Sequence, residues 1–209
     1  MKPLLTGLLS LLVILPAAFA AEQRPNIIFK DTYDDGTNPL HGRQKPNGAL
    51  RGFKGSLYEG GHRVPFIARW PGRIAAGGVS SQLMGHVDTL AAFAALTGQT
   101  LPADAGPDSF NVLAAWLGEK TDAPARDHLV LQNNGQTPLA LRQGDWALIQ
   151  RGGDSGPQPR FELYNLTTDL AQTNNLAPEL PARVKAMSER LEQLRQQGHS
   201  RPPSESGTR

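Results

Sequence analysis

The sequence predicts an α/β protein in which a small C-terminal antiparallel sheet is packed by a helix. Short apolar runs separated by turn residues indicate four strands, at 129–131, 139–141, 146–149 and 161–164. Apolar residues at 180, 184, 187, 191 and 194 then recur at spacings of three and four, which is typical of a helix with one apolar stripe. The 22 glycines and 17 prolines indicate many turns and argue against a helical bundle.

The first 20 residues have the pattern of a removable signal peptide. Lys2 gives a basic start, 4–15 is an apolar run, and Ala18-Phe19-Ala20 places small residues before a cleavage point at Ala21. The run falls short of the roughly 20 apolar residues that a membrane-spanning helix needs. We therefore expect an exported protein, periplasmic or extracellular, with no membrane segment once the leader is removed.

Further elements are expected between the leader and the sheet: strands at 26–29 and 64–70, and helices at 88–96 and 110–117. Asp88 is the expected N-cap of the first helix. The stretch 31–61 is glycine-rich and polar, which indicates an irregular surface loop. The polar, proline-containing tail 198–209 is expected to be disordered.

Composition and the absence of certain motifs argue against several classes of function. The net charge is only +2, so nothing in it favours a nucleic-acid partner. The sequence has no cysteine, and therefore no disulfide, thiolate metal ligand or cysteine nucleophile. It also contains no Gly-x-Ser-x-Gly nucleophile elbow and no phosphate loop ending in Gly-Lys-Ser/Thr. Its histidines are scattered without the spacing of a helical metal site: His41, His62, His86, His128 and His199.

The stretch from His41 to Arg73 carries seven Lys or Arg residues against one acid, Glu59. Its glycines let the backbone approach a ligand and turn N–H groups toward it. Cations combined with open backbone donors suit a tetrahedral oxyanion such as sulfate or phosphate. On composition alone, the alternative is a solvated basic loop without a ligand.

The order of residues in this stretch resembles the lysine-bearing segment of the sulfatase family. Residues 52–65 read Gly-Phe-Lys-Gly-Ser-Leu-Tyr-Glu-Gly-Gly-His-Arg-Val-Pro, and the family pattern is Lys-Gly-x-x-x-Glu-Gly-Gly-x-Arg-Val-Pro. Similar segments follow in the family's order: Arg69-Trp70-Pro71-Gly72, Val87-Asp88, Thr97-Gly98, 140–146, 162–166 and Asn175-Leu176-Ala177. The resemblance covers about 32–197. It implies an alkaline-phosphatase-like sulfatase fold in truncated form.

On this basis we divide the chain into a signal peptide (1–20), a partial sulfatase α/β domain with the lysine-bearing loop (21–125), a C-terminal sheet plus helix (126–197), and the tail (198–209). The resemblance implies sulfuric ester hydrolysis of the arylsulfatase type, on a sulfated small molecule or glycan. It makes Lys54 the sulfate contact, because an ammonium can neutralise a sulfate oxygen as the ester breaks. Glu59 and Arg63 are expected to pair structurally, and His62 to be exposed with a minor substrate contact.

Residues 32–36, Thr-Tyr-Asp-Asp-Gly, are similar to the family's Thr-Ser-Asp-Asn-Gly element, which brings two calcium ligands. The resemblance therefore implies that Asp34 and Asp35 bind Ca²⁺, a hard cation that prefers oxygen ligands. Two alternatives remain open. The pair forms an ordinary Asp-Gly turn, or it corresponds to the metal pair that follows the family's first strand.

Sulfatases cleave with a formylglycine made from the Cys or Ser of a Cys/Ser-x-Pro-x-Arg motif, and this sequence contains no such motif. Formylglycine therefore cannot form from it, and no nucleophile is assigned. The chain resembles a sulfatase whose catalytic N-terminal core is missing, and we expect it to be inactive. Three alternatives are a secreted noncatalytic module that binds sulfated glycans, a phosphate or phosphonate ester hydrolase of the same superfamily, and a deletion product that folds poorly.

Overall fold

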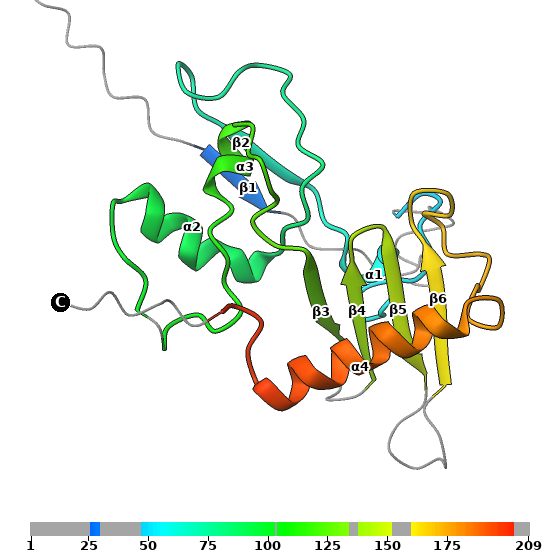
Figure 1. Cartoon of the computed structure of the whole chain (residues 1–209). Helices are drawn as coiled ribbons and strands as arrows, with labels where there is room; N and C mark the ends of the chain where they lie inside the picture. The colour runs from blue at the N-terminus through cyan, green and yellow to red at the C-terminus, as the bar shows by residue number, and fades with distance from the viewer. Residues whose placement is uncertain (1–25, 30–46, 103, 134–137, 152–159, 203–209) are drawn as a thin grey trace, which may run out of the picture.

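The computed structural model describes residues 26–29, 47–102, 104–133, 138–151 and 160–202 (Figure 1). In chain order the elements are β1 (Asn26–Phe29), α1 (Glu59–His62), β2 (Phe66–Arg69), the 3₁₀ turn η1 (His86–Asp88), α2 (Thr89–Leu96), α3 (Leu113–Leu117), β3 (His128–Gln132), β4 (Leu139–Gln143), β5 (Trp146–Arg151), β6 (Arg160–Asn165) and α4 (Pro181–Gln197). Within the described ranges, none of the helices is both long and apolar enough to cross a membrane.

The C-terminal part is the four-stranded antiparallel sheet expected from the sequence, with strand order β3-β4-β5-β6. Gly144 closes the β4–β5 turn at φ 53°, a left-handed conformation that glycine adopts without steric cost. Leu141, Leu148 and Leu163 stand opposite one another across three strands. Their side chains are fully buried beneath α4. The predicted apolar stripe of α4 meets them with Met187, Leu191 and Leu194.

The opposite face of the sheet is covered by the segment that leads into α1. Alternate strand residues point to opposite faces, and Ala140, Ile149 and Tyr164 pack there against Leu57 and Tyr58. Figure 1 shows α4 in front of the sheet and α1 behind it. The sheet is therefore the middle layer of three, and its rear layer carries the lysine-bearing loop.

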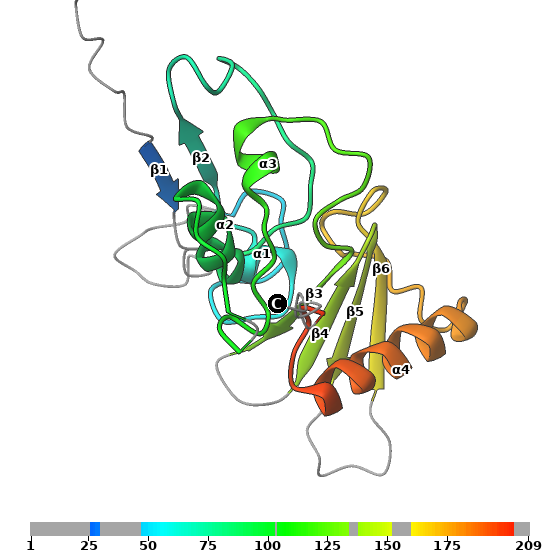
Figure 2. The same ribbon diagram turned by 60° about the vertical axis from the view of Figure 1, so that its left-hand side comes forward.

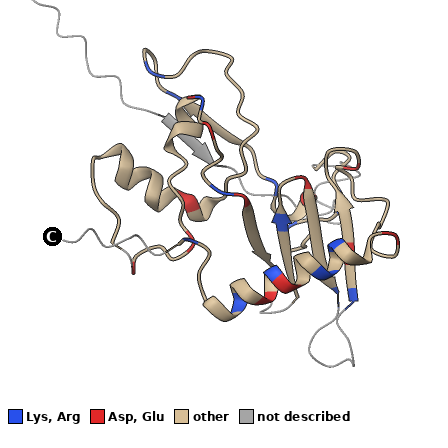
Figure 3. Cartoon of the chain, viewed as in Figure 1, with Lys and Arg blue, Asp and Glu red and all other residues tan. Residues whose placement is uncertain are grey.

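The outer side of α4 is polar and carries charges of both signs (Figure 3). Lys185 contacts Glu189 at 2.6 Å, and Arg195 contacts Glu192 at 2.9 Å. Opposite charges at these spacings lie next to each other on the helix surface and favour the helix weakly. The helix ends at Gly198, which has φ 71°.

A second, smaller core joins the two-stranded sheet β1-β2 to α2 and α3 (Figure 2). Ala92, Val112 and Trp116 form its buried centre, and Phe66 of β2 packs against them. The Trp116 ring lies 5.4 Å from that of Phe66 and 5.3 Å from that of Phe93. The expected strand at 64–70 and the helix at 88–96 are present within one or two residues of their predicted bounds.

Two expectations about this part are wrong in detail. Asp88 makes no side-chain cap with α2. Its oxygens instead accept hydrogen bonds from the backbone N–H groups of Gly85 (2.7 Å) and Phe110 (3.0 Å), and from Arg126 Nη1 at 2.7 and 2.8 Å. The helix expected from 110 begins only at Leu113, whose N–H donates to Asn111 Oδ1 at 3.1 Å.

The loop and the tail also differ from expectation. Residues 57–60 are buried against the sheet and form part of a helical turn, so the surface-loop prediction fails there. The beginning of the tail is ordered: Ser200 donates to Asp108 Oδ1 through its N–H and hydroxyl, and Arg201 donates to the Pro102 and Ala105 carbonyls. The tail packs because these donors meet carboxylate and carbonyl acceptors on the loop before α3.

We predict that Asp88→Asn destabilises the fold strongly. Both Asp88 and Arg126 are fully buried, so removing one charge leaves the other uncompensated, at a cost of about 3–5 kcal/mol. Urea unfolding measures the change. Asp122→Asn, at an exposed position, is the control and should stay within about 0.5 kcal/mol of the unmodified protein. Equal stability of the two variants would show that the buried pair is not an anchor.

Candidate functional site

Lys54 lies on an exposed, hydrogen-bonded turn ahead of α1. The Ser56 N–H donates to the Phe53 carbonyl at 2.9 Å, and the Phe53 N–H donates to Ser56 Oγ at 3.2 Å. Gly52 and Gly55 flank the lysine with φ 87° each, in the left-handed region that favours glycine. The turn therefore holds Lys54 at an exposed position on a defined backbone.

The glycine pair Gly60-Gly61 lets this turn fold directly onto α1. The Gly60 N–H donates to the Arg51 carbonyl at 2.8 Å. A Cβ at Gly60 would lie 2.5 Å from the Gly52 carbonyl oxygen, and a Cβ at Gly61 would overlap the Ser56 carbonyl oxygen. Only glycine fits at both positions, because backbone carbonyls occupy the space of a side chain.

Arg51 ties the same turn to the C-terminal sheet. Its Nη1 donates to the Tyr164 hydroxyl at 2.9 Å and to the Gln172 carbonyl at 3.0 Å, and its guanidinium stacks over the Tyr58 ring at 3.9 Å. The hydroxyls of Tyr58 and Tyr164 both donate to Glu162 Oε2, at 2.7 and 2.9 Å. Burial, and then the nearby Glu162 carboxylate, raise the pKa of Tyr164 to about 12. Tyr164 therefore stays protonated and keeps donating.

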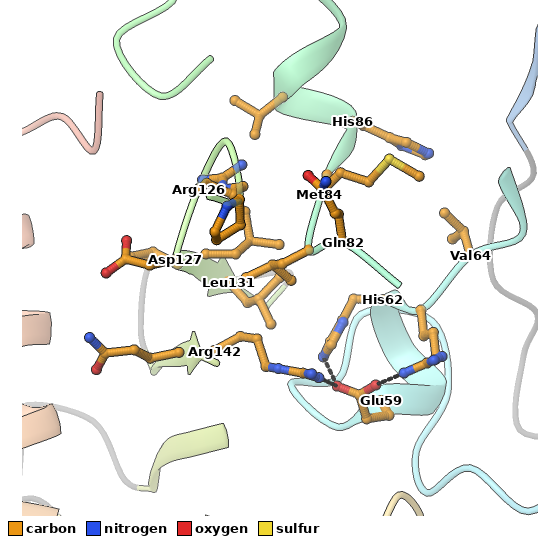
Figure 4. A pocket seen from close by; sticks show the side chains of 18 of the residues that line it. Glu59, His62, Val64, Gln82, Met84, His86, Arg126, Asp127, Leu131 and Arg142 are labelled. Carbon is orange, nitrogen blue, oxygen red and sulfur yellow. Dashed lines mark hydrogen bonds and ion pairs between the residues drawn. The ribbon is translucent and has the colours of Figure 1, made fainter. Parts of the chain in front are cut away.

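Glu59 is a buried carboxylate, 3% exposed, with basic side chains around it (Figure 4). Oε2 accepts from Arg63 Nη1 at 2.8 Å, so the expected structural pair is present. Oε1 accepts from Arg142 Nη1 of β4 at 3.4 Å and lies 4.0 Å from His62 Nε2. The Glu59 N–H donates to the side-chain carbonyl of Gln172 at 2.7 Å. One residue of α1 is thus joined to β4 and to the loop after β6.

His62 differs from its predicted place. It was expected to be exposed, but its side chain is only 22% exposed and lines a cavity. Burial lowers the pKa of His62; Arg142 and Arg63 also lower it, against the opposing effect of Glu59. The ring is therefore neutral at pH 7 and offers one donor and one acceptor nitrogen.

The cavity has a volume of about 1130 Å³ and lies between α1, the segment before α2 and the strands β3 and β4. His62 and Glu59 form one wall, and Gln82, Met84 and His86 lie across from them (Figure 4). Lys54 is not part of the lining. The two substrate contacts expected from the sequence, Lys54 and His62, therefore lie on one loop and helix. His62 lines the cavity, whereas Lys54 lies on the exposed turn outside it.

The calcium ligands expected at Asp34 and Asp35 lie outside the described residues. In the ranges that the structure describes, no group of three or more His, Cys, Asp or Glu side chains is placed to hold a metal ion. The calcium assignment thus stays a prediction.

Sequence reasoning found Lys54 and Glu59 but missed three side chains that hold them. Arg51, Arg142 and Gln172 come from separate segments, and only the fold brings them to α1. Arg142 lies in the segment 140–146 that resembles the family, which was the one available signal. Gln172 had none: it is fully buried at φ 54°, a backbone conformation uncommon outside glycine.

Comparison with known proteins agrees with this geometry. The sulfatase family model matches residues 31–99, which include the Lys54 turn and α1. An N-acetylgalactosamine-6-O-sulfatase of Bacteroides thetaiotaomicron is 35% identical over 191 residues, which are 85% of this chain and 35% of that protein. The chain belongs to the sulfatase family.

Further sulfatases are similar to this chain in sequence and in fold. The human N-acetylgalactosamine-6-sulfatase is 40% identical over 99 residues, which are 47% of this chain and 18% of that protein. A solved Bacteroides thetaiotaomicron protein of glycosaminoglycan metabolism superposes with a TM-score of 0.69 at 33% identity, covering 83% of this chain and 39% of its own. The chain thus spans about a third or less of the length of these sulfatases.

We predict that Gly60→Ala disrupts the sulfatase-type turn. The added Cβ would push against two backbone carbonyls, which cannot move without unseating the turn, at a cost of about 1–3 kcal/mol. Thermal unfolding measures the loss. Gly78→Ala is the matched control, because a Cβ there meets the Ala75 carbonyl oxygen at 3.4 Å, an ordinary contact. A Gly60→Ala protein as stable as the control would contradict the packing described here.

We also predict an acid-sensitive contribution from His62. Because folding lowers its pKa below 6.5, the unfolded chain takes up the proton first, and stability falls as the pH drops below that value. In His62→Gln this part of the loss should disappear. Melting temperatures between neutral and mildly acidic pH test it, with His86→Gln as the control for losing one imidazole. Parallel pH profiles for the unmodified protein and His62→Gln would refute the assignment.

Proposed function

We propose that this chain recognises sulfate esters on sulfated sugars, with Lys54 contacting the sulfate, and that its family reaction is sulfate ester hydrolysis. The observation that carries the proposal is the family match over 31–99, which contains the ordered Lys54 turn. Two further proteins support the substrate class. One relative is named for N-acetylgalactosamine 6-sulfate, and a solved structure of the same fold contains D-glucosamine-2-N,6-O-disulfate as its substrate (TM-score 0.53, 23% identity).

The geometry suits such a role for Lys54. An ammonium at the tip of a turn is a compact charge that can approach a sulfate oxygen, and it stabilises negative charge that grows as the ester bond breaks. Preorganisation strengthens this effect, because a group already in place need not be ordered when the ligand arrives. The Gly60 N–H holds the turn by donating to the Arg51 carbonyl, and the Arg51 side chain holds it by donating to the Tyr164 hydroxyl.

We further propose that the chain, with this sequence, binds sulfate esters but does not hydrolyse them. Covalent sulfate ester hydrolysis in this family needs a formylglycine, and the sequence contains neither cysteine nor a Ser-x-Pro-x-Arg motif. Calcium binding by Asp34 and Asp35, and export directed by residues 1–20, are also proposals. Both rest on the sequence patterns alone.

The turnover proposal predicts that the purified chain releases nitrophenol from 4-nitrophenyl sulfate no faster than buffer does. The physical reason is the missing nucleophile, since a cation alone lowers the barrier only for a bond that another group attacks. The measurement is absorbance over hours at high protein concentration. Release above buffer that Lys54→Ala abolishes would show that the chain uses another nucleophile.

The binding proposal predicts retention on a heparin column at low salt, with Lys54→Ala eluting clearly earlier than the unmodified protein. Exposed charges are screened over about 8 Å at physiological ionic strength, so moderate salt should release the chain. Lys120→Ala removes an equal charge at another exposed position and is the matched control. Equal shifts for the two variants would reduce the interaction to diffuse charge attraction and remove the assigned role of Lys54.

A further inference from the structure

The charged side chains that line the cavity beside α1 are largely paired within the protein. Arg63 and Arg142 donate to Glu59. Arg126, which also lines the cavity, donates to the buried Asp88, and Asp127 Oδ1 lies 2.6 Å from His128 Nδ1. A sulfate group entering the cavity would have to compete with existing carboxylates for these cations. The cavity is therefore a poor site for an anion, although it is rich in arginine.

Apart from Asp145, the remaining lining is uncharged and of mixed polarity. Gln143 and the uncharged ring of His62 provide hydrogen-bonding groups, whereas Met84, Val87 and Leu129 provide apolar surface. Small-molecule sites combine apolar walls with a few polar groups in this way, over roughly 300–1,000 Å³. At about 1130 Å³ the cavity exceeds the space that one small ring fills. Its chemistry matches a molecule with hydroxyl edges and apolar faces.

We infer that this cavity is a subsite for an uncharged sugar ring of the glycan whose sulfate group meets Lys54. The inference rests on the proposed function for the identity of the ligand, but its evidence is separate. The Lys54 turn packs on Gly60 and Gly61, and the next residue of α1, His62, lines the cavity. A single loop and helix thus carries a cation for the sulfate and, in His62, an uncharged hydrogen-bonding group for a ring.

The test is an NMR shift titration with two probes, N-acetylgalactosamine and N-acetylgalactosamine 6-sulfate. Val87→Trp introduces bulk into the lining at a position that is 41% exposed, and Val79→Trp makes the same change at a position that is 96% exposed and outside the lining. We expect Val87→Trp to weaken binding of the unsulfated sugar roughly tenfold or more, and Val79→Trp to leave it unchanged. His62→Ala should weaken it in the same direction.

The Lys54→Ala variant separates this inference from the proposed function. It should bind N-acetylgalactosamine as the unmodified protein does, and lose only the extra affinity for the 6-sulfate. If Lys54→Ala changes neither affinity while Val87→Trp still weakens both, the sulfate role falls and the sugar subsite stands. If the unmodified protein does not bind N-acetylgalactosamine, or if Val87→Trp and His62→Ala bind it normally, the subsite is overturned. Backbone amide spectra establish that each variant is folded.

Discussion

The buried carboxylate of Glu59 is the interaction on which the lysine-bearing face depends. A buried charge without partners costs several kcal/mol, so this residue is tolerable only while Arg63 and Arg142 surround it. Arg142 belongs to β4, and the Glu59 N–H is bound by Gln172 from the loop after β6. The requirement to satisfy one carboxylate therefore fixes a four-residue helix, too short to be stable alone, against a sheet formed much later in the chain.

Close backbone approach is the second constraint, and it explains why two glycines follow Glu59. The Lys54 turn reaches α1 only because Gly60 and Gly61 leave room for the carbonyls of Arg51, Gly52 and Ser56. A helix of this length gains little from propensity, and two glycines reduce it further. The two glycines thus disfavour the helix locally but allow the turn to pack closely on it. Such a conflict between local propensity and tertiary packing is typical of functional positions.

Local patterns in the sequence predicted the parts of the fold that depend on local periodicity. The strands of the C-terminal sheet and the stripe of α4 follow from alternation and from spacings of three and four, because each buries a regular face. The role of Asp88 could not be predicted in this way, since its partner Arg126 is 38 residues away. The burial of Tyr58 was missed for the same reason: its neighbours lie on β4, β5 and β6. For the site, the motif pointed to Lys54, whereas its supports Arg51 and Gln172 are visible only in three dimensions.

Pairing determines how the basic residues of this chain divide between structure and recognition. Arg51, Arg63, Arg126 and Arg142 all donate to acceptors within the protein, so a count of positive charge overstates what is presented to a ligand. An ion pair that is already satisfied offers a new anion little, because the anion must replace a carboxylate that is held in place. In the proposed function, specificity for a sulfated sugar depends on where the Lys54 cation stands relative to the cavity beside α1, and less on total charge. The turn before α1 and the cavity beside it provide that arrangement within one short stretch of backbone.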